Sequence, residues 1–337
     1  MPDSIRDTET EALYRGILGS LFSAYRVLHD PLMAHLSQQH PKPENMKQAD
    51  YERTIAARAF DVTRYLLPLA ARTNVGQVVS IRTLEKQITR LLSSQLPELR
   101  AIGEDLKDAC QKPPINVWGD LAGQNGVTQD PLAPTLARHA TPSPYQAEVY
   151  TDLARYAKDL FKDTGLDQPA SWTTPGQAPK LVDLVPPHDP YDELVATLLY
   201  RVGHAPYRNI LEMVQLWPSQ NKQQVIEIAL QKRGPHDELI KEFRCGYAFV
   251  FDVLMDIGGW RDMHRHRRCQ QVQQNFTTVH GYDVPPPLIA AGLEHDYRAA
   301  MNAVTTDLDR LRKTDQEAAL YALPFAFKVR CLFKMDY

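Results

Sequence analysis

Apolar side chains in most of the chain recur every three or four residues, the spacing that places them along one face of an α-helix. The segment 9–29 carries such a stripe, and 51–69 repeats the pattern until Pro68 ends it. The stripe in the first segment consists of Leu13, Ile17, Leu18, Leu21, Phe22, Tyr25 and Leu28. The same spacing predicts further helices at 80–110, 147–163, 190–202, 208–217, 222–231, 235–256, 291–312 and 315–322.

Segments with the character of β-strands are short and few. We expect strands only around 77–80 and 326–332. Because helical periodicity dominates both halves of the chain, the pattern predicts a mainly helical α+β protein.

Prolines divide the sequence into three parts. They are most frequent between 113 and 190, in stretches such as KPPINVWGD, TPSPY and LVPPHDPYDE. Proline lacks a backbone donor and restricts the residue before it, so this stretch cannot form one continuous helix or sheet. We therefore interpret 111–190 as a connector along the surface, with one helix at 147–163, between a first module at 1–110 and a second at 191–337.

Two short matches indicate that the two modules are related. YRGILGSLFSAYRVL (14–28) and YRAAMNAVTTDLDRL (297–311) share a Tyr-Arg start and a helical length. Further on, TRYLLPLAART (63–73) aligns with ALYALPFAFKV (319–329), which pairs Pro68 with Pro324. Each module would then hold a helix that ends at Leu-Pro, followed by an extended segment. Matches as short as these can also arise by chance.

Composition and charge narrow the class of protein. The chain has 337 residues, 43% of them hydrophobic and 23% charged, enough for one large domain or two ordinary ones. Its net charge of −3 gives no general attraction to nucleic acid or to anionic lipid. We expect no nucleic-acid partner and no membrane partner, since no apolar run approaches the length of a bilayer span. The four cysteines form no C-x-x-C pair, and a cytoplasmic protein is expected.

The densest basic stretch is GWRDMHRHRRCQQ, residues 259–271. It holds four arginines and two histidines against one acidic side chain: Arg261, Arg265, Arg267, Arg268, His264, His266 and Asp262. Guanidinium groups bind phosphate and carboxylate in a bidentate manner, which suits an anion site. Periodicity alone favours a solvated basic turn after an apolar helix at 245–260. A metal site is not expected, because no spaced carboxylate or cysteine completes it and the arginines would repel a cation.

The stretch TTVHGYDVPPPL (277–288) follows as a loop, because Gly281 permits a positive φ and three prolines prevent a helix. It contributes His280 and Tyr282 as candidate site residues. In the first half, Arg64 precedes the Leu-Pro stop and Arg82 begins the next helix. Lone arginines on helices are more often solvated than ligand-binding, so these two are candidates only in combination with other signals.

These segments resemble the flavin-dependent thymidylate synthases, and in particular their long tandem form. Arg265-His266-Arg267 matches the Arg-His-Arg that opens the family signature, and TTVHGYDVP at 277–285 closely matches the tandem relatives. In the first half, ARAFDVTRYLLPLAARTNVG followed by SIRTLEKQI is similar to the family's Ala-Arg-x-x-Leu-Pro and Asn-Ala-Arg-x-Leu region, with Arg64 and Arg82 at the matching places. The resemblance covers about 9–110 and 190–337.

The resemblance implies an enzyme that methylates dUMP to dTMP with FAD as cofactor, and with methylenetetrahydrofolate and NADPH as co-substrates. It implies cofactor-binding roles for His264, Arg265, His266, Arg267, His280 and Arg82. It implies substrate-binding roles for Arg64, Arg268 and Tyr282. Such a site needs no catalytic nucleophile from the protein. Because the family's active sites lie between subunits, we expect either a homo-oligomer or an intrachain pseudo-dimer.

Several positions depart from the family pattern. The signature's polar residues are replaced by Gln270, Val272, Asn275 and Thr277-Thr278, and the first half has no Arg-His-Arg. The sequence also reaches Tyr337 where the Arg-bearing helix of the second half is expected, so we expect a longer protein or a site without one wall. The alternative function is a non-catalytic flavin- or nucleotide-binding scaffold of the same family. A more distant one is a helical protein whose basic segment binds a phosphorylated partner.

Overall fold

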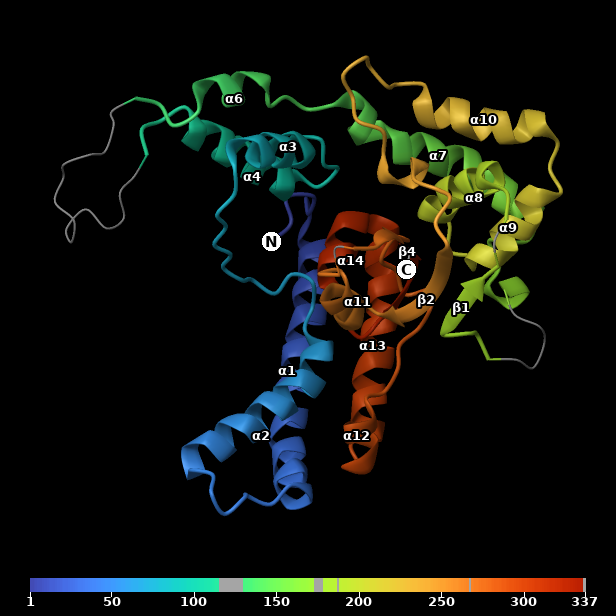
Figure 1. Ribbon diagram of the computed structural model, residues 1–337. Helices are drawn as coiled ribbons and strands as arrows, with labels where there is room; N and C mark the ends of the chain where they lie inside the picture. The colour runs from blue at the N-terminus through green and yellow to red at the C-terminus, as the bar shows by residue number, and fades with distance from the viewer. Residues whose placement is uncertain (115–129, 173–177, 187, 267, 336–337) are drawn as a thin grey trace.

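The computed structural model describes residues 1–114, 130–172, 178–186, 188–266 and 268–335 (Figure 1). Helices predominate, and the one sheet in these residues has four antiparallel strands in the order β1-β2-β4-β3. The strands are β1 (Val182–Val185), β2 (Phe249–Asp256), β3 (Gln270–Gln273) and β4 (Lys328–Met335). The predicted mainly helical α+β class is therefore confirmed.

The first hydrophobic core is built on two long helices that lie side by side and run in opposite directions, α1 (Thr8–Gln39) and α13 (Glu294–Thr314) (Figure 1). The helix predicted at 9–29 is longer than expected, because it continues through Pro31 to Gln39. Burial explains the extension, since Leu32 and Leu36 prolong the apolar stripe into the same core. The core is completed by α2 (Gln48–Thr63), the 3-10 turn η1 (Arg64–Leu66), α12 (Pro286–Ala290) and α14 (Gln316–Ala322).

The two Leu-Pro stops meet and pair with each other. Pro68 and Pro324 form an antiparallel bridge, and four backbone hydrogen bonds surround it in two symmetry-related pairs. In one pair Leu69 N–H donates to Leu323 O (2.9 Å) and Phe325 N–H to Leu67 O (3.1 Å); in the other Ala70 N–H donates to Tyr321 O (2.7 Å) and Ala326 N–H to Tyr65 O (2.9 Å). This corner, the Leu-Pro corner, thus has local twofold symmetry, whereas the duplication of whole modules stays a prediction.

The sheet corrects two expectations. The helix predicted at 235–256 is wrong: the 3-10 turn η3 (Lys241–Phe243) lies in an irregular stretch, and β2 follows it. An apolar run looks alike in a buried strand and in a buried helix, and here Val250, Asp252 and Leu254 alternate with less buried residues. The strand predicted at 77–80 is also wrong, since this segment pairs with no strand among the described residues. The strand predicted at 326–332 is confirmed as β4.

A second core lies over one face of this sheet, where Val250, Val272 and Leu332 meet a group of helices. The helices are α7 (Pro144–Asp163), α8 (Pro190–Val202), α9 (Tyr207–Gln215) and α10 (Ser219–Leu230). The described part of 111–190 holds more structure than a surface connector with one helix, because α7 is buried in this core and β1 joins the sheet. It also contains α6 (Pro134–His139) and the 3-10 turn η2 (Pro169–Trp172).

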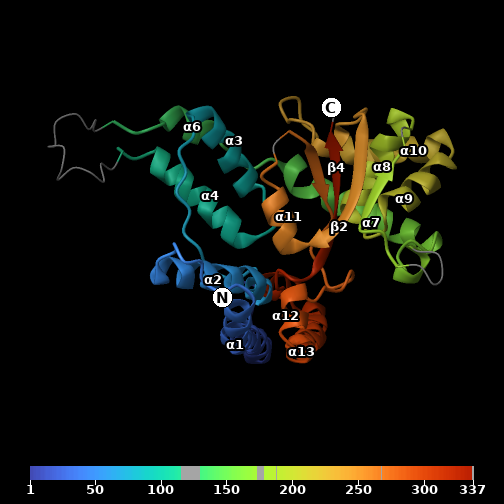
Figure 2. The ribbon, with the colours of Figure 1, turned by 60° about the horizontal axis from the view of Figure 1, so that its bottom comes forward.

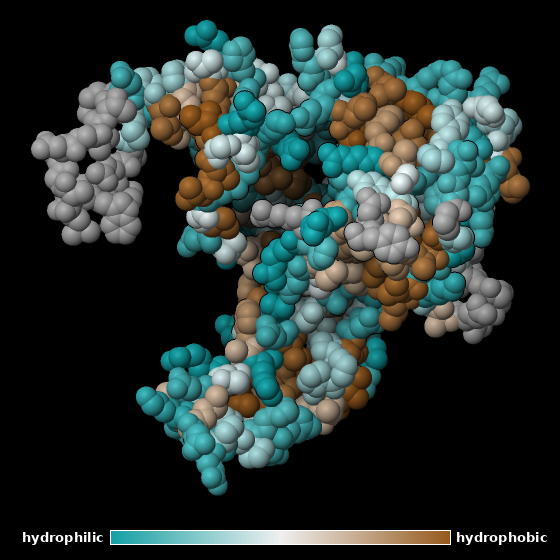
Figure 3. All heavy atoms as spheres, in the orientation of Figure 1, coloured by the Kyte–Doolittle hydropathy of each residue, from teal (hydrophilic) through white to brown (hydrophobic). Residues whose placement is uncertain are grey.

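The helix predicted at 80–110 is two helices, α3 (Ile81–Leu92) and α4 (Pro97–Cys110), because Pro97 begins a new helix instead of continuing the first. Together with α6 they enclose a third, small core. Tyr321 donates a hydrogen bond to Glu98 (2.6 Å), and Lys86 pairs with Glu238 (2.5 Å), which ties this cluster to the rest of the protein. Figure 2 shows the cluster as a separate unit, and the surface in Figure 3 is hollowed between it and the main body.

Two buried ion pairs join β4 to its neighbours. Arg330 and Asp252 pair at 3.0 Å, and Lys334 and Glu193 at 2.6 Å, with all four side chains nearly inaccessible to water. Lys334 also donates to Thr197 (2.9 Å) of α8. Buried charges are tolerated only when they are paired and hydrogen-bonded, so these contacts fix how α8 sits on the sheet. None of the described helices combines the length and the apolar character that a membrane span requires.

Candidate functional site

The predicted basic stretch begins in the short helix α11 (Ile257–Met263), which follows β2 directly. Asp256 caps this helix by accepting from Gly259 N–H (2.5 Å) and is also hydrogen-bonded to Tyr65. The backbone passes so close to Tyr65 that a Cβ on Gly258 would lie 2.8 Å from that ring. The turn η1, which follows α2, is thus packed against the start of α11.

Arg64, predicted from the first half, reaches the far end of α11 and meets the basic turn there. Asp262 accepts from Arg64 at 3.1 Å and from Arg265 at 3.2 Å, and Arg261 lies 3.8 Å from the same carboxylate. Asp61 also pairs with Arg64, at 3.3 Å. One carboxylate is therefore shared by three guanidinium groups from both halves of the sequence. We call Arg64, Arg261, Asp262 and Arg265 the arginine cluster.

The remaining residues of the basic turn are open to solvent. His264 packs against Trp260 with ring centroids 4.9 Å apart, and the Arg265 side chain is 79% exposed. His266 and Arg268 are exposed as well. Arg267, the last residue of the predicted Arg-His-Arg, lies outside the residues that the structure describes. The turn thus presents basic groups toward solvent around the arginine cluster.

Three predicted residues lie elsewhere. His280 is packed among Trp172, His204 and Gln274, and burial lowers its pKa to about 3. Tyr282 donates to Asn302 (2.7 Å) on α13. Arg82 is exposed in the first turn of α3, and within the described ranges no hydrogen bond or ion pair joins it to the arginine cluster.

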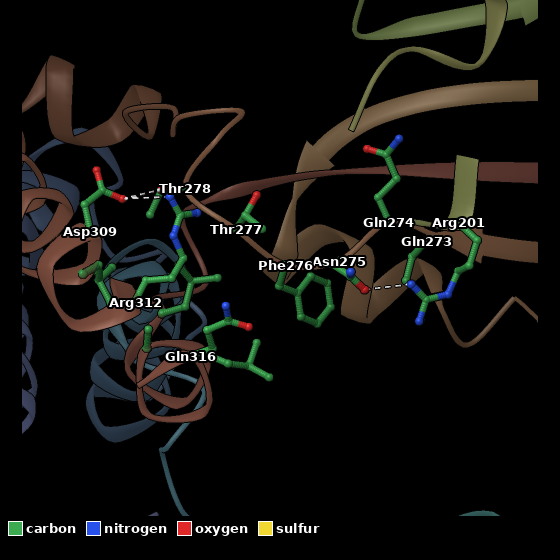
Figure 4. Close-up of a pocket in the computed structure, with 14 residues that line it drawn as sticks. Arg201, Gln273, Gln274, Asn275, Phe276, Thr277, Thr278, Asp309, Arg312 and Gln316 are labelled. Atoms are coloured by element: carbon green, nitrogen blue, oxygen red, sulfur yellow. Dashed lines mark hydrogen bonds and ion pairs between the residues drawn. The ribbon is translucent and has the colours of Figure 1, made fainter. Parts of the chain in front are cut away.

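A cavity of about 350 Å³ opens on another side of the same region (Figure 4). It lies between residues 273–278, which follow and include the end of β3, and the helices α8, α13 and α14. Of the predicted site residues that the structure describes, none lines it. Asn275, Thr277 and Thr278, which depart from the family signature, do line it.

Arg201 of α8 lies at one end of this cavity. It donates to Asn275 Oδ1 (2.8 Å), its guanidinium lies 4.5 Å from the ring centre of Tyr150, and Glu242 is 3.9 Å away. Lys241 donates to Gln273 (3.0 Å) at the same end, and burial lowers the pKa of Lys241. This end therefore combines two cationic side chains with one carboxylate.

Arg312 of α13 stands at the other end. It pairs with Asp309 at 3.6 Å, and Asp309 accepts from Thr278 (3.1 Å). Sequence reasoning did not find Arg201 or Arg312, because each lies on a helix far in sequence from the basic turn. The available signal for Arg201 was a single arginine that ends the otherwise apolar run VATLLY.

One aromatic side chain that lines the cavity contacts the helix at which the basic turn begins. Phe276 lines the cavity and meets Trp260 edge-on, with ring centroids 5.2 Å apart. Trp260 lies on α11 and packs against His264, which follows that helix. Among the described residues, no group of three or more histidine, cysteine, aspartate or glutamate side chains is placed to hold a metal ion. The region thus holds two neighbouring candidate anion sites, the arginine cluster and the cavity.

A family model matches the last part of the chain, and curated relatives align with nearly all of it. Residues 240–337 match the family model described as thymidylate synthase complementing protein. Over 327 residues the chain is 24% identical to a UPF0159 protein of Chlamydia pneumoniae, covering 96% of this chain and 57% of that protein. A UPF0159 protein of Chlamydia muridarum is 25% identical over 321 residues, covering 94% and 56%.

A third relative, a UPF0159 protein of Thermoplasma acidophilum, is 22% identical over 347 aligned positions, covering 95% of this chain and 63% of that protein. The chain thus spans somewhat more than half the length of the curated relatives that it matches. No solved structure matches it. The segment that carries β2, the arginine cluster's α11, α13, α14 and β4 is therefore similar to the thymidylate synthase complementing proteins.

Proposed function

We propose that the protein is a flavin-dependent thymidylate synthase, which methylates dUMP to dTMP with FAD, methylenetetrahydrofolate and NADPH. The observation that carries this proposal is the arginine cluster, where Arg64 meets the turn that begins Arg265-His266 within the matched segment. Arg64 from the first half of the sequence and Arg265-His266 from the second half were each expected at the site. The cytoplasm is the expected location, and a homo-oligomer or an intrachain pseudo-dimer is the expected assembly.

The side chains of the arginine cluster suit a flavin dinucleotide. Three guanidinium groups face two carboxylates, Asp262 and Asp61, so the cluster keeps an excess of positive charge that attracts a further anion such as a pyrophosphate. The Nε of Arg64 is buried and has no hydrogen-bond partner among the described residues. When bound, FAD supplies the hydride-transfer chemistry that no side chain of the cluster offers.

The chain's own residues would bind and orient. Arg265 is solvent-accessible and donates toward Asp262 from one side, whereas Arg64 approaches from the other and is mostly buried. Asp262 hydrogen-bonds to both guanidinium groups and burial constrains Arg64 further, which lowers the entropy cost of binding a phosphate between them. His264 and His266 on the exposed turn add imidazole groups that can hydrogen-bond to phosphate oxygens.

A second candidate function is a non-catalytic flavin- or nucleotide-binding relative. The observation that favours it is Val272, which stands at a polar position of the family signature and is completely buried in the second core. A ligand therefore cannot contact this side chain. This relative would bind FAD or dUMP without oxidising NADPH or forming dTMP, so an assay of dTMP formation separates the two functions.

Substitution of Arg265 or His266 by alanine is expected to weaken FAD binding, by roughly tenfold or more for Arg265, because a charge-assisted hydrogen bond to phosphate is lost. Titration of the purified protein with FAD, followed by flavin fluorescence, measures the effect. Arg310→Ala is the matched control, since Arg310 is exposed on α13 and pairs with Asp307 at 3.4 Å. Equal FAD affinity in Arg265→Ala, His266→Ala and the control would contradict the proposed role of the basic turn.

A further inference from the structure

We infer that residues 72–79 form an open strand position, at which a polypeptide other than this chain adds β-strands along both edges. The partner would present extended, mainly apolar strands without a buried charge toward the bound segment. This inference goes beyond the proposed function, because it concerns an interaction surface and requires neither a flavin nor a nucleotide.

The Leu-Pro corner relates this segment to β4. The corner places Pro68 opposite Pro324 and surrounds them with backbone hydrogen bonds in symmetry-related pairs. Counted from the two prolines, 72–79 has the same positions as Lys328–Met335, which is β4. In the second half this stretch lies inside the sheet, between β2 and β3, and β2 pairs with all 8 of its residues.

The equivalent segment of the first half has no such neighbours. Within the described part of the chain, no backbone hydrogen bond is made by 72–79, and each of these residues is exposed. Figure 1 shows the segment as an open arc between η1 and α3, away from the sheet. Val75 is 84% exposed and Val78 is completely exposed. The donors and acceptors of this backbone are therefore accessible to a partner strand.

The composition of the segment favours pairing over a solvated linker. Thr73, Val75, Val78 and Val79 are β-branched, and such residues are enriched in strands. Exposed strand edges are usually protected from association by charged side chains or proline, and 73–79 has neither. Exposure of the valine side chains to water is unfavourable, and burial against a partner removes this cost.

The chemistry of the partner follows from a contrast with β4. Arg330 of β4 is buried and pairs with Asp252 of β2, and Lys334 is buried as well. At the equivalent positions the first half has Asn74 and Val78, which are uncharged. A carboxylate on the partner strand would therefore be buried without a cation, which is strongly unfavourable. The position fits a strand similar to β2 in which the acidic residue is replaced by an uncharged one.

A second copy of this chain does not supply these strands. Its β2 and β3 are already paired with its own β4. Pairing between the 72–79 segments of two copies would cover one edge of each segment and leave the other edge without hydrogen bonds. The curated relatives are longer than the part that this chain matches, of which it spans 56–63%, so further sequence exists that can provide such strands.

A synthetic peptide with the β2 sequence Phe249–Asp256, carrying Asp252→Asn and a lysine tag for solubility, tests the inference. Fluorescence anisotropy of the labelled peptide measures its binding to the full chain. Hydrogen exchange, followed by mass spectrometry, locates it. We expect the amides of 73–79 to exchange fast in the chain alone and roughly tenfold or more slowly with saturating peptide. The peptide that retains Asp252 should bind more weakly, because its carboxylate finds no cation.

Two variants at one exposed position separate backbone pairing from other contacts. Val78→Pro should bind the peptide roughly tenfold or more weakly, because proline removes a backbone donor and is not tolerated inside a sheet. Val78→Thr, the matched control, keeps the donor and the β-branched shape and should bind as the unchanged chain does. Since the Val78 side chain is completely exposed, neither variant removes a packing contact within the fold.

Five results would overturn the inference. They are slow exchange of 73–79 in the chain alone, no peptide binding, equal binding by the two Val78 variants, binding of the Asp252 peptide as tight as that of the Asp252→Asn peptide, and a dimer that Val78→Pro dissociates. The last result, detected by analytical ultracentrifugation, would assign the position to a second copy. FAD affinity should be equal in both variants, and absence of FAD binding in the unchanged chain would contradict the proposed function alone.

Discussion

Replacing Asp252 by alanine is expected to lower the free energy of unfolding by about 3–5 kcal/mol, the cost of removing one partner of a buried ion pair. Asp252 is 1% exposed and accepts three hydrogen bonds: from Arg330 (3.0 Å), from the Tyr200 hydroxyl (3.0 Å) and from Tyr207 N–H (2.8 Å). Burial by itself raises the pKa of this carboxyl, and Arg330 opposes that rise. The substitution would leave a buried guanidinium and two buried donors without their acceptor.

Urea unfolding of Asp252→Ala and of the unchanged protein, followed by circular dichroism, measures this loss. Asp307→Ala is the matched control, because Asp307 forms an exposed pair with Arg310 and its removal should cost less than about 1 kcal/mol. A loss below about 1 kcal/mol in Asp252→Ala would mean that the Arg330–Asp252 contact does not hold β2, β4 and α8 together.

The second large effect is a loss of stability in acid that depends on His280. Burial lowers the pKa of His280 to about 3 in the folded protein, below the ordinary value of 6.5 that it regains on unfolding. The unfolded chain therefore binds the proton more readily, and the folded state loses stability as the pH falls from 6.5 toward 3. At about 1.4 kcal/mol per pKa unit, the full shift corresponds to roughly 5 kcal/mol. His204, whose pKa burial also lowers, adds in the same direction.

Unfolding free energies between pH 4 and pH 7 check this expectation. His280→Gln should flatten the dependence on pH, because glutamine does not titrate and can still reach Gln274. His295→Gln, at an exposed histidine of α13, should leave the slope unchanged. Identical slopes in the unchanged protein and in His280→Gln would contradict the buried, neutral state of this histidine.

Helices with one buried and one exposed face were predicted from the sequence far better than the strands of the sheet were. In α1 and α13 polar, charged or small residues separate the apolar positions in most turns, so the period of 3.6 is visible. The run that forms β2 is almost continuously apolar up to its last residue, Asp256, and the charged residue within it, Asp252, is buried and pairs with Arg330. A buried charge on the inner face removes the alternation that would have marked a strand. Long-range pairing with β4 decides the structure there, and no local pattern reports it.

The candidate site was predictable only where a motif marks it. Arg64 and Arg265 were expected at one site from two separate segments, and the structure joins them through Asp262. The cavity was not foreseen, because Arg201 and Arg312 come from helices whose sequences carry no signature. Their proximity depends on how α8 and α13 pack against the segment after β3. His280 shows the reverse case, a residue in a matching motif that lies away from the cluster.

The central claim is that the arginine cluster supports a flavin enzyme. The most direct test is the visible absorbance spectrum of the purified full-length chain, recorded before and after addition of FAD and removal of the unbound cofactor. The proposed function predicts a flavin absorbance band that stays with the protein. The band should fade when NADPH is added in the presence of dUMP, because NADPH reduces the flavin. A protein that retains no flavin absorbance after incubation with FAD would contradict it.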